Sequence, residues 1–421
     1  MPRSQEHRDH DPAASRGGRA RIPGTVWALG FTSLLMDTSS ELVHSLLPVF
    51  LVAVLGVSMA AIGVLEGVAE ATAAVSKVFS GTLSDYLGRR KLLVVLGYGL
   101  SAATKPVFPL AGSVAWVFGA RFVDRIGKGI RGAPRDALVA DVTPPGGRGA
   151  AYGLRQALDT VGAVVGPLLA MALMALLAND IRAVLWGAVA PGALAVLLLM
   201  VAVREPERSR RAPGRSPIAR TDLGRLPARY WLVVILGSVL TMARFSEAFL
   251  ILRAGSVGVG PAWVPLVLVT MNVAYALSAY PAGVTADRMS RRALLALGLG
   301  VLIAADLLLA AATTPLVVFG GVALWGLHMG LTQGLLATLV AATAPDDMRG
   351  TAFGLFNLAT GAVLLPASVL AGVLWSRLGP AATFLAGAGF TAIALAGIAS
   401  VRPAGGRRAS AGEDVQGPPP S

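Results

Sequence analysis

Cysteine is absent from this sequence, and charged residues and histidines are few. The lack of Cys among 421 residues excludes disulfide bonds, thiolate metal sites and cysteine nucleophiles. Only 14% of the residues are Asp, Glu, Lys or Arg, which is well below the share in soluble domains. His44 and His328 are isolated in apolar segments, with no second His or suitably spaced carboxylate, so we expect no metal site. Because the sequence also lacks a nucleotide-binding motif and a nucleophile paired with a base, we expect neither an enzyme nor a cofactor.

Apolar residues dominate the chain. They make up 55% of it, and the mean hydropathy is +0.67. A helix needs about 20 predominantly apolar residues to cross a bilayer. Twelve segments are long enough: 27–54, 62–84, 92–112, 114–137, 150–177, 182–203, 229–253, 262–285, 293–312, 315–340, 351–375 and 380–400. The sequence therefore predicts an all-α integral membrane protein with twelve transmembrane helices in a lipid bilayer.

The basic residues predict how these helices are oriented. The formal net charge is +13, but Arg and Lys gather in the gaps between apolar segments and form no basic face with interleaved aromatics. We therefore expect no nucleic acid partner. Basic residues precede the first segment and follow the second, sixth and eighth, whereas the alternate gaps hold few, Arg182 and Arg377 being the clear cases. Because cytoplasmic loops carry the excess of Lys and Arg, both termini are predicted to be cytoplasmic, in a multi-pass protein of the cell membrane.

Two pairs of similar motifs divide the chain. Residues 81–90, GTLSDYLGRR, recur at 283–292 as GVTADRMSRR, and residues 143–154, TPPGGRGAAYGL, recur at 344–355 as APDDMRGTAFGL. Both recurrences have nearly the same displacement, which indicates an internal duplication. We therefore predict two pseudo-symmetric six-helix bundles, at 26–203 and 229–401, joined by a Pro- and Arg-rich cytoplasmic linker at 204–228. The polar tails at 1–25 and 402–421 are predicted to be disordered.

The motif after the second segment carries a family resemblance. Gly81-x-x-x-Asp85-x-x-Gly88-Arg89-Arg90-Lys91 is similar to the signature of the major facilitator superfamily of secondary transporters at this position. The second copy of the motif differs in having Ser290 where Gly88 stands in the first. The resemblance extends over nearly the whole chain outside the tails, and it implies the twelve-helix fold of that family.

Four further features resemble members of the same family. Arg121 in the fourth segment matches a buried arginine of the family. Gly162-x-x-x-Gly166-Pro167 in the fifth resembles the helix-kinking motif of proton-coupled antiporters, although Leu168 to Met171 stand where the family has a further Gly pair. DTSSELVHSLLPVFL (37–51) and DRIGKGIRGAPRDAL (124–138) are similar to a large prokaryotic subgroup.

The resemblance also implies a gate. Asp85 lies at the C-terminal end of its helix, where the helix dipole disfavours an anion, so its carboxylate needs a compensating partner. The implied partners are the start of the eleventh helix, near Arg349 and Gly350, and Arg131 or Arg135 at the inner end of the fourth. Such contacts form only while the cytoplasmic side is closed. Alternatively, the basic residues only fix the topology. The predicted gate residues are Gly81, Asp85, Arg89, Arg90, Arg131, Arg135, Gly283, Asp287, Arg291 and Arg292.

The fourth segment is unusually charged for a transmembrane helix. Residues 120–136, ARFVDRIGKGIRGAPRD, include basic and acidic side chains that must face the protein interior or a watery cavity. The tenth segment, its counterpart, lacks these charges, which favours a cavity wall over a role required by the fold. The alternative is a static network of ion pairs, which the near balance of acids and bases in the first half favours. The predicted coupling or cavity residues are Asp37, Glu41, Glu66, Glu70, Arg121, Asp124, Arg125, Lys128, Arg155, Asp159, Arg244 and Glu247.

Helix geometry suggests how some of these charges pair. At a rise of about 1.5 Å per residue, Glu70 and Arg121 lie at about the same depth in the second and fourth segments. Pairing of Glu70 with Arg121 or Arg125 is therefore expected, and of these two we expect Arg121 to be the structural partner and Arg125 to face the substrate. Lys105 and Asp306 correspond in the third and ninth segments, and we expect them to be structural or interfacial.

These features predict a secondary transporter that moves a small solute by alternating access around a site near the midplane. Proton coupling is expected because buried carboxylates can load and release protons, and Glu41 ranks first because its counterpart Glu247 is also acidic. Export is favoured; the alternative is uptake of an anionic metabolite or metal chelate attracted by Arg121, Arg125 and Arg155. The alternative of another class is a non-transporting receptor or scaffold with the same fold. Solute, proton and bilayer are the expected partners, and the chain is expected to function as a monomer.

Overall fold

The computed structural model describes residues 22–87, 89–144, 147–205, 224–286, 289–345 and 348–400. Within these ranges the chain consists of helices and short connections, with no strand. The all-α class is thereby confirmed. The predicted tails, apart from residues 22–25, lie outside the described residues, and so does most of the predicted linker.

Two groups of helices follow one another along the chain. The first consists of α1 (Gly24–Val49), the π-helical η1 (Phe50–Val54), α2 (Met59–Leu87), α3 (Arg90–Thr104), α4 (Val107–Leu110), α5 (Val114–Val142), α6 (Arg148–Leu176), α7 (Ile181–Trp186) and α8 (Val189–Ala202). The second consists of α10 (Ala228–Ala243), α11 (Ala248–Ser256), α12 (Leu266–Ala286), α13 (Arg291–Ala311), α14 (Pro315–Thr343), α15 (Arg349–Leu378) and α16 (Pro380–Ser400). Several short helices continue one another across the bilayer, so that α1 with η1, α3 with α4, α7 with α8, and α10 with α11 each form one span.

Composition and arrangement together give twelve spans. Ten spans in the described residues are long and apolar enough to cross a membrane by themselves. The other two are α5 and α12. The charged residues of α5 reduce its apolarity, and the apolar part of α12 is the shorter stretch Leu266–Ala282. A hydrophobic scale alone therefore misses α5, because its polar side chains face the protein and not the lipid.

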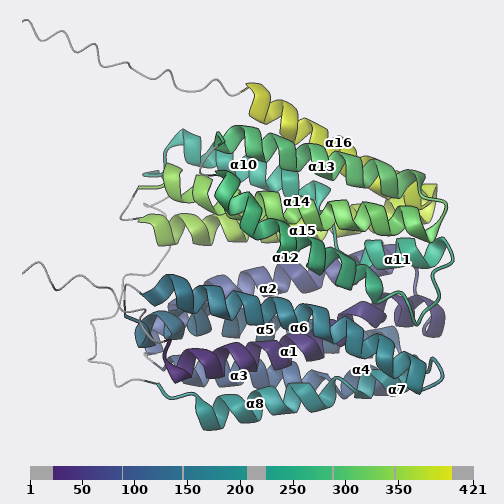
Figure 1. The fold of residues 1–421 in the computed structure, drawn as a ribbon, viewed down its shortest axis with the longest axis horizontal. Coiled ribbons are helices and arrows are strands. Elements are labelled where there is room, and N and C mark those ends of the chain that lie inside the picture. Colours follow the sequence, from purple (N-terminus) through teal and green to yellow (C-terminus); the bar gives the residue numbers. More distant parts are fainter. Residues whose placement is uncertain are drawn as a thin grey trace, which may run out of the picture.

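The helices form two bundles side by side (Figure 1). In the first, α1 packs on α6 and α8, and α5 packs on α2 and α3. In the second, α14 packs on α12 and α13, and α16 packs on α10 and α13. The bundles meet where α2 contacts α15, α6 contacts α12 and α1 contacts α11. This is the predicted pair of six-helix bundles.

The apolar core joins the bundles at one end only. The end where the described chain starts and finishes is named the terminal end, and the opposite end the far end. One continuous buried cluster joins the bundles in the far half, where it includes Phe50 and Ile62 from the first bundle and Phe249 and Trp375 from the second. In the second bundle alone it continues toward the terminal end, for example to Leu294. In the terminal half each bundle has a separate cluster of its own, around Tyr98 and around Tyr230, for example. Close packing of shared apolar side chains thus holds the bundles together at the far end.

Small residues let α2 and α15 approach closely in the far half. The amide of Ala60 donates a hydrogen bond to Ser376 Oγ at 3.2 Å. A Cβ atom added to Gly67 would lie 2.9 Å from the carbonyl oxygen of Leu365, so the two backbones touch where glycine stands. Contacts between small residues favour this kind of helix association in membranes. The far end is therefore closed by direct backbone packing.

Candidate functional site

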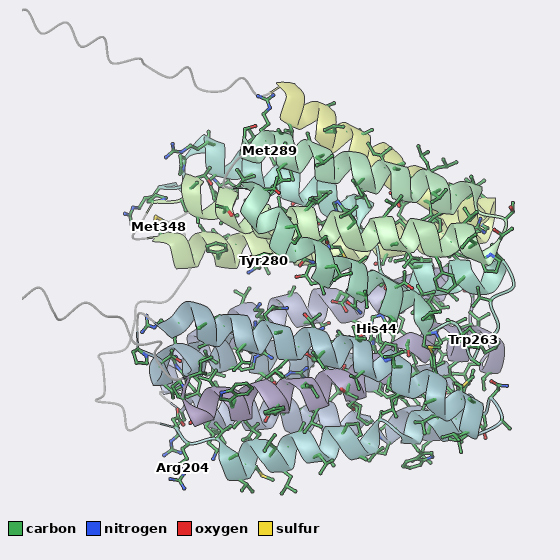
Figure 2. All side chains as sticks on the ribbon, viewed as in Figure 1. His44, Arg204, Trp263, Tyr280, Met289 and Met348 are labelled. Carbon is green, nitrogen blue, oxygen red and sulfur yellow. The ribbon has the colours of Figure 1, made fainter. Side chains whose placement is uncertain are left out.

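A polar cavity lies between the bundles, below the closed far end. Its deep part has a volume of about 420 Å³ and is lined by Glu41, His44, Glu70, Arg125, Lys128, Ala163, Thr241, Arg244, Phe245, Ser246, Glu247, Asn272, Trp325, Thr360 and Leu364. A second part of about 430 Å³ extends toward the terminal end and adds Asp37, Lys77, Arg131, Arg135, Asp136, Asp159 and Tyr275 to the lining. Glu41, Glu70 and Lys128 line both parts, which makes them contiguous. His44 lies at the junction of the bundles (Figure 2).

Two ion pairs between α2 and α5 lie at and behind the wall of the deep part. Arg121 Nη2 lies 2.9 Å from Glu66 Oε2, and Arg125 Nη1 lies 3.1 Å from Glu70 Oε1. Of the two partners expected for Glu70, Arg125 forms the pair, and the expectation that Arg121 is its structural partner is wrong. Both helices run toward the terminal end, so one turn along α2 is matched by one turn along α5 and both pairs form in the same register.

Another pair lies behind this wall. Lys105 Nζ donates to Asp124 Oδ1 at 2.9 Å and to Ser40 Oγ at 3.0 Å. Arg125 Nε lies 3.5 Å from the other oxygen of Asp124. Asp124 is thus compensated by two cations and does not line the cavity. Lys105 has the structural position that we expected.

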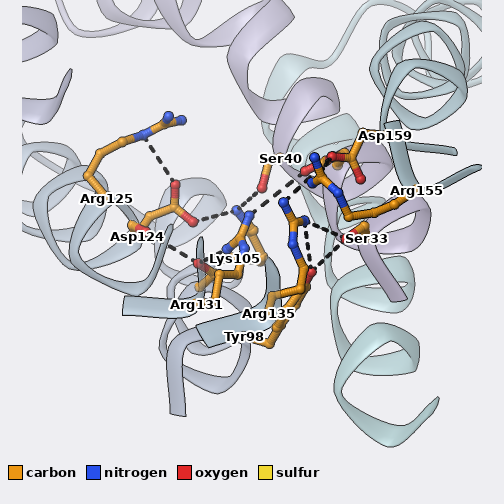
Figure 3. Close-up of polar contacts among 12 residues, drawn as sticks. Ser33, Ser40, Tyr98, Lys105, Asp124, Arg125, Arg131, Arg135, Arg155 and Asp159 are labelled. Atoms are coloured by element: carbon orange, nitrogen blue, oxygen red, sulfur yellow. Dashed lines mark hydrogen bonds and ion pairs between the residues drawn. The ribbon is translucent and has the colours of Figure 1, made fainter. Parts of the chain in front are cut away.

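A network of arginines and acids surrounds the part of the cavity nearer the terminal end (Figure 3). Arg155 Nη1 lies 2.7 Å from Asp159 Oδ2 and 3.6 Å from Asp136 Oδ1. Arg135 lies 3.7 Å from Asp159 and donates to Ser33 Oγ at 2.6 Å. Arg155 does not reach the cavity surface, whereas Asp159, which it pairs with, does.

The predicted coupling residues therefore fall into two groups. Eight of them line the cavity, and the other four lie behind it in ion pairs. The four that the structure does not bring to the cavity surface are Glu66, Arg121, Asp124 and Arg155. Lys128 lines the cavity, Arg121 lies in the ion network behind it, and Arg125 lines the cavity and also forms an ion pair.

The second bundle contributes a break in a helix. α10 ends at Ala243 and α11 begins at Ala248, so Arg244 to Glu247 are non-helical at the depth of the cavity and line it. Non-helical backbone at this depth is tolerated where it borders a cavity. Phe245 packs against Trp325 at a centroid distance of 5.6 Å, which gives this side of the cavity an aromatic surface. The predicted residues Arg244 and Glu247 thus both lie on the cavity surface.

Sequence reasoning missed two contacts of this region. Ser246 Oγ lies 3.3 Å from Glu66 Oε2, which forms a hydrogen bond between the bundles. Arg121 Nη2 lies 3.4 Å from His44 Nδ1, so His44, which appeared isolated in the sequence, adjoins the ion network. The signal for the first contact was RFSE (244–247), a polar interruption of an apolar run. Nothing in the local sequence indicated the second, because His44 and Arg121 come from helices that are far apart along the chain.

The described side chains of the second bundle leave one buried carboxylate without a partner. Asp306 on α13 is 0% exposed, and neither of its oxygens has a hydrogen-bond partner in the part of the chain that the structure describes. It does not line the cavity. Its counterpart in the first bundle, Lys105, forms an ion pair with Asp124. The second bundle has Trp325 at the position that corresponds to Asp124, so Asp306 has no such partner there.

Comparisons with known proteins identify this architecture. A model of the Major Facilitator Superfamily matches residues 29–252 and 236–420. The chain belongs to this superfamily. It is 32% identical over 374 residues to the uncharacterized MFS-type transporter MJ1317 of Methanocaldococcus jannaschii, covering 86% of this chain and 91% of the relative. The quinolone resistance protein NorA of Staphylococcus aureus is 25% identical over 217 residues, about half of each chain.

Solved structures show the same fold. A bacterial homologue of the human lysosomal transporter Spinster, in an inward-facing conformation, superposes with a TM-score of 0.73 over 91% of this chain and 97% of the other, at 16% identity. Membership of the superfamily makes the protein a secondary transporter and not an enzyme. Its helices form the twelve-helix fold of that superfamily.

The superfamily's gate motif is only partly described by the structure. Arg90 Nη1 lies 2.9 Å from Asp141 Oδ2, and Arg89 is exposed. Arg131 lies 3.8 Å from Asp37 and donates to Ser101 Oγ at 2.7 Å. The structure does not describe the side chains of Asp85 and Arg291, or any part of Asp287. It describes Gly283 only as part of α12. Gly81 and Arg292 are described, but the gate stays a prediction.

The glycines of the antiporter-like motif lie in a tight helix contact. A Cβ atom on Gly162 would lie 2.6 Å from the carbonyl oxygen of Leu34, and one on Gly166 would lie 2.6 Å from that of Thr38. α6 continues as one helix through Pro167. The motif therefore lets α6 touch the α1 backbone beside the cavity, and its predicted kinking role stays a prediction.

Proposed function

We propose that this protein exports a small solute across the cell membrane in exchange for protons, by alternating access of the central cavity. The observation that carries the proposal is the polar cavity between two bundles that share a core at the far end and have separate cores at the terminal end. A rocking motion about a midplane site would close the terminal end and open the far end. The bundles themselves can move as packed units.

The charge distribution supports an orientation of the cavity toward the cytoplasm. The terminal end carries the basic gaps of the sequence, which favours a cytoplasmic position. The cavity then opens to the cytoplasm in this state and can be loaded from inside the cell. Similarity over about half of the chain to a protein named for quinolone resistance also favours removal of a compound from the cell.

Proton coupling rests on Glu41. Its carboxylate lines both parts of the cavity, and among the described residues no cation lies within ion-pair distance of it. Because access to the cavity alternates, Glu41 can bind a proton on one side of the membrane and release it on the other.

The ion pairs weigh against the alternative of anion uptake. That hypothesis depended on Arg121, Arg125 and Arg155, and each of these has a carboxylate partner. Their positive charge is therefore largely compensated within the first bundle. Membership of a transporter family likewise weighs against a non-transporting receptor or scaffold.

Metabolite profiling of a deletion strain tests this proposal. We expect the exported solute to accumulate inside the deletion strain and to decrease in its medium, relative to the parent. The wild-type chain should reverse both changes, and Glu41→Gln should not, because it cannot exchange a proton. Arg377→Gln, a change at an exposed residue outside the cavity, is the matched control and should act like the wild type. Depletion of a solute inside the deletion strain would indicate uptake and contradict export.

A further inference from the structure

The deep part of the cavity contains charges that the protein itself does not pair. Six charged side chains line it: Glu41, Glu70, Arg125, Lys128, Arg244 and Glu247. Glu70 and Arg125 pair with each other. Among the described residues, the other four have no oppositely charged atom within ion-pair distance. Two carboxylates and two cations are thus left facing the same space.

Charges of both signs in one wet cavity offer ion pairs to a solute. Glu41, Arg244 and Glu247 are partly buried and Lys128 is exposed, so water can solvate them, and a solute group of opposite charge can replace that water with a charge-assisted hydrogen bond. A purely anionic solute would meet Glu41 and Glu247, and a purely cationic solute would meet Lys128 and Arg244. A solute that carries one charge of each sign can present its cationic group to Glu41 and Glu247 and its anionic group to Lys128 and Arg244. The charged side chains of the lining are equal in number for the two signs, so a solute with no net charge keeps the cavity neutral.

The placement of these four residues supports a site shared by both bundles. Glu41 lies on α1 and Lys128 on α5, in the first bundle. Arg244 and Glu247 lie at the two ends of the break between α10 and α11, in the second. Discontinuous transmembrane helices are where transporters form their substrate sites, because the free helix ends and irregular backbone face the ligand. Each bundle therefore offers one acid and one base.

An aromatic surface completes the site. Phe245 stands inside the same helix break, and it packs against Trp325, which is 2% exposed and also lines the cavity. Aromatic faces bind apolar bodies and stack with rings. The volume of about 420 Å³ suits a compound of the size of a small drug or dipeptide.

We propose that the deep cavity binds a zwitterionic organic solute with an apolar, preferably aromatic, body. Its ammonium group lies between Glu41 and Glu247, its acidic group is held by Arg244 and Lys128, and its body packs against Phe245 and Trp325. This assignment rests on the proposed function, since it names the solute class of the same cavity. It also explains why the arginines of α5 are neutralised by neighbouring acids: an excess of positive charge would repel the ammonium group.

Binding to the purified full chain in lipid nanodiscs tests the assignment. The probes are several aromatic dipeptides, each in four forms: the free zwitterion, the N-acetyl anion, the C-terminal amide cation and the doubly blocked neutral compound. We expect the zwitterionic forms to raise the melting temperature most. The assignment is overturned if the anionic, cationic or neutral forms stabilise the protein more, or if no zwitterionic form stabilises it.

Charge-neutralising variants test the placement of each group. Glu41→Gln and Glu247→Gln should weaken zwitterion binding about ten-fold or more, the loss of one charge-assisted hydrogen bond, and shift the preference toward the anionic form. Arg244→Gln and Lys128→Gln should shift it toward the cationic form. Arg377→Gln, outside the cavity, should leave both affinity and preference unchanged. Equal weakening of all four forms in every variant would indicate a structural effect and contradict the placement.

Failure of this assignment and failure of the proposed function are distinguishable. The binding measurement requires no transport, no proton gradient and no conformational cycle. Binding of zwitterions without any change in metabolite profiles would contradict export and leave the assignment intact. Altered profiles together with binding of anions alone would leave export intact and contradict the assignment.

Discussion

At the scale of single residues, the fourth span shows how a membrane protein can keep many charges in its interior. Each arginine in the deep half of α5 faces an acid on α2, and the two pairs occupy successive turns. Their surroundings differ, however. The side chains of Glu66 and Arg121 are both 2% exposed, whereas the side chain of Glu70 is 30% exposed and faces the cavity. The same type of ion pair therefore has a structural role in one turn and borders the solute in the next.

This difference predicts unequal effects of two similar substitutions. Arg121→Gln leaves the carboxylate of Glu66 buried and uncompensated, which costs about 3–5 kcal/mol. Arg125→Gln leaves Glu70 in contact with the wet cavity, so we expect a smaller loss of stability and a change in solute binding. Thermal unfolding in nanodiscs, with and without a bound dipeptide probe, measures both effects. Arg121→Lys should recover part of the stability because it restores the charge.

An equal loss of stability in the two glutamine variants, with unchanged probe affinity in the surviving Arg125→Gln protein, would contradict this account. The fourth span would then be an ion network throughout its length, including the part that lines the cavity.

At the scale of helices, periodicity predicts which faces are polar but not how helices are aligned. The spacing of Arg121 and Arg125, and the transmembrane length of α5, follow from the sequence. The pairing with Glu66 in place of Glu70 does not, because a shift of one turn along a helix changes neither its polar face nor its apolar length. Register is decided by tertiary packing, which the sequence of one helix does not contain.

The break between α10 and α11 has a similar explanation. Arg244 to Glu247 contain no Pro or Gly, so local propensity gives no reason for the helix to end there. The break is stabilised by distant partners: Ser246 contacts Glu66, and Phe245 packs against Trp325 and Phe384. The balance of charge in the cavity could not be predicted from the sequence either, because it depends on which acids and bases of different helices lie close together.

The contact of α6 with α1 leads to a prediction about a helix pair. Gly166→Val would force its side chain against the carbonyl oxygen of Thr38 and Cβ of Glu41, so the two helices must separate. Overpacking of this kind costs about 1–3 kcal/mol, and the displaced Glu41 should also lower solute binding. Gly153→Val on the same helix is the matched control, because a Cβ atom there meets open space.

Thermal unfolding and probe binding of the two valine variants decide the question. We expect Gly166→Val to lose both stability and affinity, and Gly153→Val to retain both. Retention of both properties in Gly166→Val would show that the glycines of this motif do not hold α6 against α1.

At the scale of the whole molecule, two bundles with the same fold have divided the chemistry of the cavity. The first supplies the ion pairs of α2 and α5, and the second supplies the helix break and the aromatic surface. The fold and the duplication could be predicted from apolar segments and repeated motifs, because both leave a signal along the chain. The difference between the cavity residues of the two bundles could be predicted only in outline, from the charges that the tenth segment lacks.

Alternating access requires the two bundles to move about the cavity, and distances between spin labels measure this movement. Because the chain has no Cys, labels can be attached at introduced cysteines alone. Gly153 and Tyr280 are exposed on α6 and α12 near the terminal end, and Leu176 and Trp263 are exposed near the far end of the same pair of helices. Each pair is measured by double electron–electron resonance in nanodiscs, with the natural Asp85 and with Asp85→Asn.

We predict two populations whose distances change in opposite directions at the two ends. Asp85→Asn should enrich the population with a long terminal-end distance and a short far-end distance, because it removes the carboxylate that the family resemblance assigns to closure of the terminal end. A single distance at each end, unchanged by the substitution, by pH and by a bound zwitterionic dipeptide, would contradict alternating access in this protein.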